Sequence, residues 1–154
     1  MKAPTELCPL RDGGQLAFSL HGRKTGRVPL IMICGLTATQ DVWEELPALL
    51  GRDRQVATFD NRFLGASWRP DAPAYTWEQQ AEGAAELAAH LGWSRVALLG
   101  HSMGGMIAQT LAAQRPGLVA GVVLLSTAEV GRPLQRQPRA DVLQVCRCAR
   151  ALIG

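Results

Sequence analysis

A serine surrounded by small residues lies in the stretch ALLGHSMGGMIAQ, which spans residues 97–109. An apolar run precedes it and apolar residues at helical spacing follow it, so Ser102 falls between an expected buried strand and an expected helix. Gly100, Gly104 and Gly105 would allow a turn too tight for ordinary side chains. Such a turn exposes a serine on strained backbone, and the chemistry it serves is nucleophilic acyl transfer.

Residues 100–104 read G-H-S-M-G and match the pattern G-x-S-x-G. Five residues alone carry little information, because glycines also pack at ordinary tight turns. The expected strand before the motif and helix after it are the context that gives the motif its meaning. We therefore interpret Ser102 as a candidate nucleophile in an elbow formed with Gly100, His101 and Gly104.

Short apolar stretches before and after the elbow predict the strands of a sheet. Asp12, Gly13 and Gly14 predict the turn of an N-terminal hairpin. Continuous apolar runs, typical of strands buried on both faces, are VPLIMICG and RVALLG, with RQVATFD as a shorter strand and LVAGVVLLS as a further one.

Three helices are expected between these strands. Residues 40–50 put Trp43, Leu46 and Leu50 on one face, and Pro47 should kink that helix or shift its boundary. A second helix covers about residues 77–91, with Thr76 and Gln79 at capping-box spacing and Gly92 as its stop, and a third runs from the elbow to near Pro116. The alternation predicts an α/β fold with a mostly parallel, doubly wound sheet that stops after about the sixth strand.

Three segments together resemble the α/β-hydrolase family over about residues 14–130. ICGLTATQDVW is similar to the family's loop after the third strand, FDNRFLGASWRP to its D-x-R-G-x-G-x-S segment, and LLGHSMGGMIAQTLAAQRPGLVAGVVLLST to its elbow, helix and sixth strand. The chain is most similar to the bacterial esterase and lactonase branch that includes 3-oxoadipate enol-lactonase. The resemblance implies hydrolysis of small carboxylic esters, lactones or thioesters with water alone, without metal or cofactor.

The resemblance also assigns roles to single residues. Ser102 would be the nucleophile, and the backbone N–H groups of Met103 and Leu36 would form the oxyanion hole. Two positions depart from the family pattern. Cys34 stands where many members have histidine, and we interpret it as a small buried side chain. Phe63 stands where glycine is expected, which predicts a rearranged or strained loop over residues 60–67.

The general base that this mechanism needs is not evident in the chain. The family order is serine, acid, histidine, but the three histidines are His21, His90 and His101, all before Ser102. We interpret His101 as a packing residue that points away from the serine, and His21 and His90 as too distant to reach it.

The catalytic acid is not evident either. Glu129 and Asp141 follow the last strand, but without a base we interpret them as solvated charges. We therefore expect a partial hydrolase core over residues 1–130 and a basic tail over 131–154, the start of a lid or a frame-shifted segment. Such a chain would be inactive alone, and its last strand would be an uncovered edge prone to self-association.

Two other functions stay open. The chain could be a non-catalytic binding or regulatory module of the same fold, or an acyltransferase that uses the same elbow.

Composition excludes several further classes. The formal charge is +3, and five arginines lie in the tail without aromatic residues, which does not favour nucleic-acid binding. The four cysteines lack metal-ligand spacing; only Cys146 and Cys148 lie close together. Neither a signal peptide nor a membrane span is evident in the sequence, so we expect a cytoplasmic protein.

Overall fold

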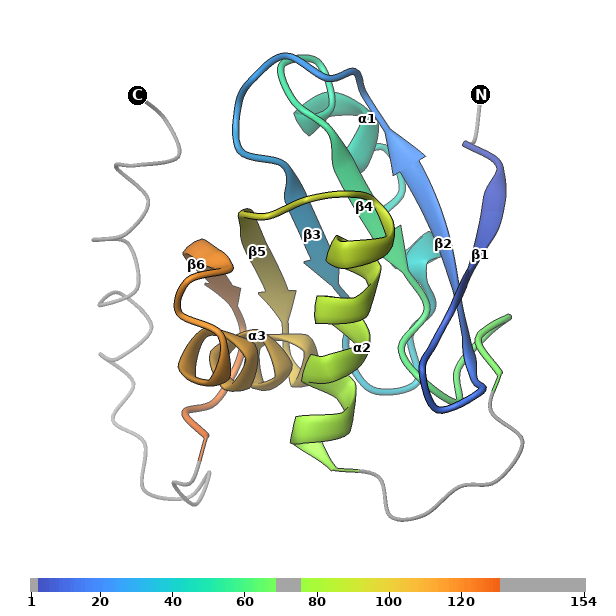
Figure 1. Cartoon of the computed structure of the whole chain (residues 1–154), viewed down its shortest axis with the longest axis vertical. Coiled ribbons are helices and arrows are strands. Elements are labelled where there is room, and N and C mark those ends of the chain that lie inside the picture. Colours follow the sequence, from blue (N-terminus) through green and yellow to red (C-terminus); the bar gives the residue numbers. More distant parts are fainter. Residues whose placement is uncertain (1–2, 69–75, 131–154) are drawn as a thin grey trace.

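The computed structural model describes residues 3–68 and 76–130, which build a six-stranded sheet (Figure 1). The strand order is β1-β2-β4-β3-β5-β6. Strands β3 to β6 run parallel, and the β1–β2 hairpin joins them antiparallel through β4. The predicted α/β class is confirmed. The strands are β1 (Thr5–Pro9), β2 (Gln15–His21), β3 (Leu30–Ile33), β4 (Val56–Phe59), β5 (Val96–His101) and β6 (Val119–Leu125).

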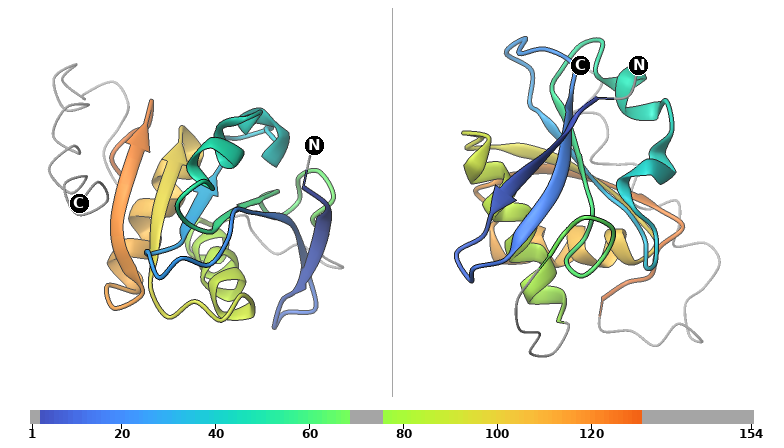
Figure 2. Two further views of the ribbon diagram at one scale, coloured as in Figure 1. Left: turned by 90° about the horizontal axis from the view of Figure 1, so that it is seen from above. Right: turned by 90° about the vertical axis from the view of Figure 1, so that its right-hand side faces the viewer.

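Helices cover both faces of this sheet. Helices α2 (Trp77–His90) and α3 (Met103–Gln114) lie on one face, and the short 3₁₀ helix η1 (Gln40–Trp43) and α1 (Leu46–Leu50) lie on the other (Figure 2). Each face has its own apolar core, because neighbouring residues of a strand point to opposite sides. Ile31 and Leu98 pack on the α2–α3 side, whereas Met32 and Leu99 pack on the α1 side.

The helix expected over residues 40–50 is two short helices instead. The chain breaks at Glu44, which has a φ of 49°, and Pro47 then lies in the first turn of α1, where its missing N–H costs no hydrogen bond. Trp43 still packs into the same core as Leu46 and Leu50, as predicted. The proline thus shifts the helix boundary rather than kinking a continuous helix.

Helix α2 begins and ends as its sequence predicts. The Thr76 hydroxyl accepts a hydrogen bond from the Gln79 N–H at 3.2 Å, and Gly92 has a φ of 70° just after the last turn. The reciprocal half of the capping box is not formed, since Gln79 Oε1 has no hydrogen-bond partner among the described residues. The hydroxyl cap alone therefore fixes the first turn.

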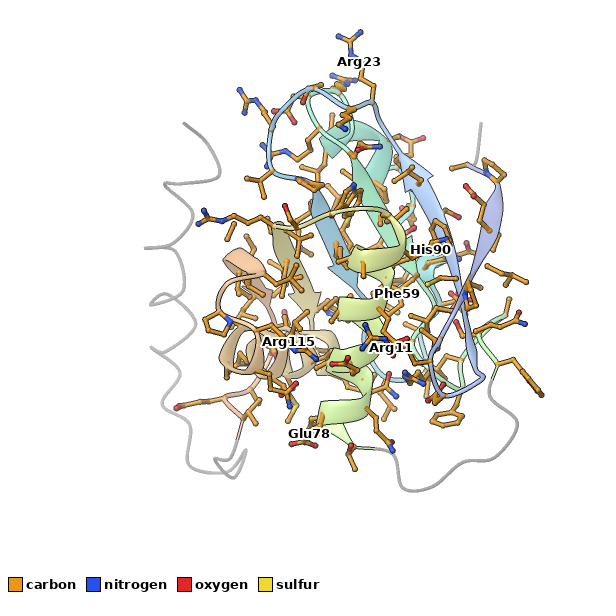
Figure 3. All side chains as sticks on the ribbon, viewed as in Figure 1. Arg11, Arg23, Phe59, Glu78, His90 and Arg115 are labelled. Atoms are coloured by element: carbon orange, nitrogen blue, oxygen red, sulfur yellow. The ribbon has the colours of Figure 1, made fainter. Side chains whose placement is uncertain are left out.

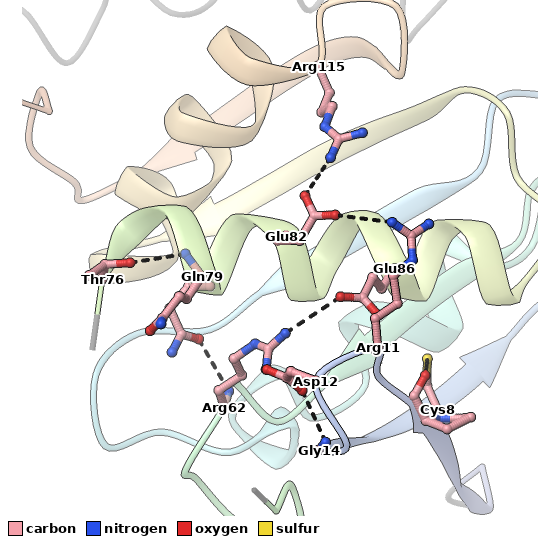
Figure 4. A network of polar contacts seen from close by, with 12 residues as sticks. Cys8, Arg11, Asp12, Gly14, Arg62, Thr76, Gln79, Glu82, Glu86 and Arg115 are labelled. Atoms are coloured by element: carbon pink, nitrogen blue, oxygen red, sulfur yellow. Dashed lines mark hydrogen bonds and ion pairs between the residues drawn. The ribbon is translucent and has the colours of Figure 1, made fainter. Parts of the chain in front are cut away.

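A buried arginine connects the hairpin turn, the segment after β4 and α2 (Figure 4). The Arg62 side chain is only 5% exposed, and its guanidinium lies 2.6 Å from the Asp12 carboxylate and 3.8 Å from that of Glu86. Its backbone N–H donates to Gln80 Oε1 at 3.2 Å. A buried cation needs such partners to offset its desolvation, so Arg62 fixes where the chain goes after β4.

The last described strand forms one edge of the sheet. Within the described residues β6 pairs with β5 alone, and all of its residues are at least partly exposed. The predictions for the tail over 131–154, including Asp141, Cys146 and Cys148, lie outside the described residues.

Candidate active site

Ser102 lies at the junction between β5 and α3, on backbone that side chains rarely adopt. Its φ is 52°, and α3 begins at the next residue, Met103. The Ser102 N–H donates to the Leu125 carbonyl at 2.9 Å. The Ser102 carbonyl accepts from the Gly105 N–H at 2.9 Å and from the Thr127 hydroxyl at 2.5 Å. These bonds hold the strained residue from both neighbouring segments.

The glycines around Ser102 are required by close backbone packing. A Cβ on Gly104 would collide with the carbonyl of Ile33, and one on Gly100 with the carbonyl of Gly104. A Cβ on Gly105 would lie 2.5 Å from the Thr127 side chain. Helix α3 therefore starts almost in contact with β3, which explains the small residues that the sequence places there.

The loop after β3 lies directly against the elbow. A Cβ on Gly35 would be 3.3 Å from Ser102 Cβ and 3.4 Å from His101 Nδ1. Leu36 follows with its side chain turned largely to solvent, since the residue is 62% exposed, and Thr37 has a φ of 63°. The loop thus brings the backbone around Leu36 next to the serine.

Buried polar residues after β4 hold that loop in place. Asn61 Nδ2 donates to the Cys34 carbonyl at 2.9 Å, and the Asp60 carboxylate accepts from the Gln40 N–H at 2.8 Å. The Cys34 thiol donates to the Ala38 carbonyl at 3.0 Å. The FDNR segment by itself predicts no role for Asp60 or Asn61. The pattern that could have indicated their role is a pair of polar residues directly after a buried strand.

Both departures from the family pattern behave as predicted. Cys34 is fully buried, and this burial raises the pKa of its thiol to about 11, so that the thiol stays protonated at neutral pH. Phe63 has a φ of 68°, which is the left-handed conformation that glycine would adopt without strain. The loop over residues 60–67 therefore keeps a glycine-like backbone while carrying a large side chain.

None of the three histidines has a hydrogen bond to Ser102 in the described structure. His90 lies near the end of α2 beside β2, as Figure 3 shows, far along the helix from its start. Burial lowers the pKa of His21. Each ring contacts another residue. His21 Nε2 is 3.3 Å from Thr58 Oγ1. The rings of His90 and Phe18 meet edge-on with centroids 5.7 Å apart, and those of His101 and Trp43 do so with centroids 6.4 Å apart.

Among residues 3–68 and 76–130, three or more histidine, cysteine, aspartate or glutamate side chains do not gather anywhere as a metal site would require. In the same ranges, no helix is both long and apolar enough to cross a membrane. Glu129 lies at the exposed surface after β6.

Comparisons with known proteins identify the family of this chain. Residues 28–146 match the model of the family described as the alpha/beta hydrolase fold. The chain belongs to the α/β-hydrolase family.

Individual α/β hydrolases are similar over most of this chain. The sn-1-specific diacylglycerol lipase ABHD11 of Mus musculus is 30% identical over 142 residues, which cover 85% of this chain and 46% of the lipase. Among solved structures, a hydrolase from Pseudomonas aeruginosa PA01 is 31% identical with a TM-score of 0.74, covering 80% of this chain and 46% of that protein. Est816, described as an N-acyl homoserine lactone degrading enzyme, is 25% identical with a TM-score of 0.72, covering 80% and 45%. The chain thus spans less than half the length of each of these α/β hydrolases.

Proposed function

We propose that this chain carries the nucleophile of a serine hydrolase that acts on carboxylic esters, lactones or thioesters. The observation that carries the proposal is Ser102 itself, held at a φ of 52° between β5 and the 12-residue helix α3. Similarity to a lipase and to a lactone-degrading enzyme supports the substrate class.

In the proposed reaction, Ser102 Oγ attacks the substrate carbonyl carbon while its proton passes to a base. The resulting oxyanion accepts hydrogen bonds from the N–H groups of Met103 and Leu36, and it lies near the positive end of the α3 dipole. Collapse of the intermediate expels the alcohol, which takes up a proton, and leaves an acyl group on Ser102. Water then releases the acid and restores the hydroxyl.

We propose that the base of this reaction is none of the three histidines, a view supported by their contacts with other residues and by the lack of a hydrogen bond to Ser102 in the described structure. Because the chain spans under half of the relatives' length, we propose the hydrolase activity for the whole protein. We also propose a cytoplasmic location. A serine without its base loses several orders of magnitude in rate but keeps its oxyanion donors.

The experiment supplies the base from solution. The chain is incubated with p-nitrophenyl acetate in the presence of increasing imidazole, and peptide mass spectrometry then locates the acetyl group. We expect acetyl-Ser102 to form faster with imidazole, and Ser102→Ala to carry none at that peptide. Folded protein that is never acetylated at Ser102 would contradict the proposal.

A second candidate, a binding module that associates through its sheet edge, is favoured by one observation. Strand β6 is apolar, partly exposed and paired on one side within the described residues. Edge strands of this kind pair with other chains. Sedimentation velocity tests this binding module: a concentration-dependent dimer that Val122→Lys abolishes would support it, and a monomer at all concentrations would exclude it.

Acyl transfer to an acceptor other than water would use the same acyl-Ser102 and is tested by adding alcohols to the acetylated chain.

A further inference from the structure

Asn61 is a fully buried polar residue just after β4, with none of its surface exposed. Its side-chain amide makes one short hydrogen bond, from Nδ2 to the Cys34 carbonyl at 2.9 Å. Asn61 Oδ1 has no hydrogen-bond partner among the described residues. Burial of an amide whose oxygen is unsatisfied adds little net stability. Stability alone therefore does not account for an asparagine at this position.

The carbonyl that receives this bond directly precedes a tight turn. The Gly35 carbonyl accepts from the Ala38 N–H at 3.4 Å, which closes a turn over residues 35–38. Thr37, the third residue of that turn, has a φ of 63°, as a type II turn requires. The Cys34 thiol donates to the Ala38 carbonyl at 3.0 Å. This second bond ties the end of the turn back to the residue before it.

The Leu36 N–H lies within this turn and donates to no other group of the described structure. It is therefore available to a substrate oxygen, and Gly35 beside it lies against Ser102. The peptide between Gly35 and Leu36 sets the direction of this N–H. Because a glycine restricts its own backbone so little, that direction depends on what holds the chain on either side of Gly35.

Two elements hold the chain on the Cys34 side. Helix α3 starts so close that a Cβ on Gly104 would lie 2.7 Å from the Cys34 carbonyl oxygen. Asn61 binds the same oxygen from the segment after β4. That segment is itself fixed, because the Asp60 carboxylate accepts from the Gln40 N–H at 2.8 Å. The amide of Asn61 thus connects an anchored segment to the peptide just before the proposed oxyanion donor.

We propose that Asn61 is a positioning residue for the oxyanion hole. Its amide fixes the Cys34 carbonyl and, through Gly35, the direction of the Leu36 N–H. The assignment rests on the proposed acyl transfer at Ser102 and adds a residue that does not touch the substrate. An oxyanion donor is effective because it is aligned before charge develops. Without the amide, Gly35 can rotate and turn the Leu36 N–H away from the developing charge.

An ester and its thiono analogue separate this role from a general loss of structure. In p-nitrophenyl acetate the developing charge lies on oxygen, whereas in O-(p-nitrophenyl) thionoacetate it lies on sulfur, a weak hydrogen-bond acceptor. The whole chain is incubated with each compound in imidazole, and peptide mass spectrometry follows acetyl-Ser102 and thioacetyl-Ser102. Misplacement of an oxyanion donor slows the ester selectively, so the readout is the ratio of the ester rate to the thionoester rate.

Asn61→Leu replaces the amide with an apolar side chain of nearly the same shape. We expect the ester rate to fall by about tenfold or more, as for a weakened oxyanion donor, and the thionoester rate to fall much less. Thr58→Val is the matched control, because it also removes a buried hydroxyl bonded to Gln40 Oε1. That hydroxyl bonds none of residues 33–38, so the control should keep the parental ratio.

Circular dichroism establishes that each variant is folded. Asn61→Ala, which leaves space instead of filling it, is measured in the same way and should change the ratio in the same direction. A parental ratio in a folded Asn61 variant, including an equal loss of both rates, would overturn the assignment and leave the proposed function intact. If the parent chain forms no acetyl-Ser102, the proposed function fails and the assignment fails with it.

Discussion

Two serines of this molecule follow neighbouring parallel strands, and both have a positive φ. Ser102 follows β5 with a φ of 52°, and Ser126 follows β6 with a φ of 46°. They differ in what comes next. Ser102 directly precedes a 12-residue helix, whereas the described residues after Ser126 form no helix.

The difference teaches that a strained serine is not sufficient for a nucleophile site. Ser102 has the N-terminus of α3 behind it and the Gly35 loop against it, because Gly104 lets the helix approach β3. Ser126 is exposed, and its successor Thr127 serves the other site by donating its hydroxyl to the Ser102 carbonyl. One strand end thus has the geometry that the proposed nucleophile needs, and the neighbouring strand end supports it through a hydrogen bond.

The largest expected effect comes from closing the gap between α3 and β3. In Gly104→Ala the new Cβ would collide with the Ile33 carbonyl and lie 2.7 Å from the Cys34 carbonyl oxygen, and both groups are backbone. We expect a loss of at least about 3 kcal/mol in the free energy of unfolding, measured by urea denaturation. The control Gly117→Ala, where a Cβ meets nothing within 4 Å, should change little. Similar stability of the two variants would show that the elbow does not depend on this approach.

The link between the two strand ends predicts the next effect. Thr127→Val keeps the shape beside Gly105 but removes the hydroxyl bonded to the Ser102 carbonyl. We expect the free energy of unfolding to fall by about 1 to 2 kcal/mol, since the partly buried carbonyl keeps one donor, the Gly105 N–H. Thr110→Val is the control, because the Thr110 hydroxyl bonds only a carbonyl of its own helix. Urea denaturation should show a change of no more than about 0.5 kcal/mol in its free energy of unfolding.

Phe63 extends the comparison to a third strand end, where a side chain again has a positive φ. Phe63→Ala and Phe63→Gly lose the same ring and differ only in backbone freedom. At a φ of 68°, we expect the glycine variant to be more stable than the alanine variant by about 1 kcal/mol. Thermal unfolding of the two variants measures this difference. At an ordinary loop position alanine is more stable than glycine, and that result would mean that Phe63 is not strained.

The smallest effect concerns the thiol at the end of β3. Burial raises the pKa of Cys34 from 9.0 to about 11, so the folded state holds this proton over a range in which the unfolded state releases it. Stability should therefore fall as pH rises from 9 to 11, by less than about 1 kcal/mol near pH 9.5. Cys34→Ala should make the decline shallower in denaturation series at several pH values. An unchanged slope would mean that the thiol ionises as readily in the folded protein as in the unfolded one.

Local patterns were sufficient to predict the strands, the α2 cap and the glycines around Ser102, because those features depend on nearby residues. Pro47 predicted a shifted helix boundary within residues 40–50, but the position of the break at Glu44 was not predictable, since helical spacing continues through that residue. The roles of Asp60 and Asn61 depend on the Cys34–Gln40 loop, which is more than 15 residues away in the chain.

The central claim is that the elbow, and not strain alone, makes Ser102 the reactive serine. The direct test is to treat the folded chain with a fluorophosphonate probe in the presence of imidazole and to map the label by peptide mass spectrometry. We predict label on Ser102, none on Ser126, and loss of label in Ser102→Ala. Equal labelling of the two serines, or a folded chain without label on Ser102, would contradict the claim.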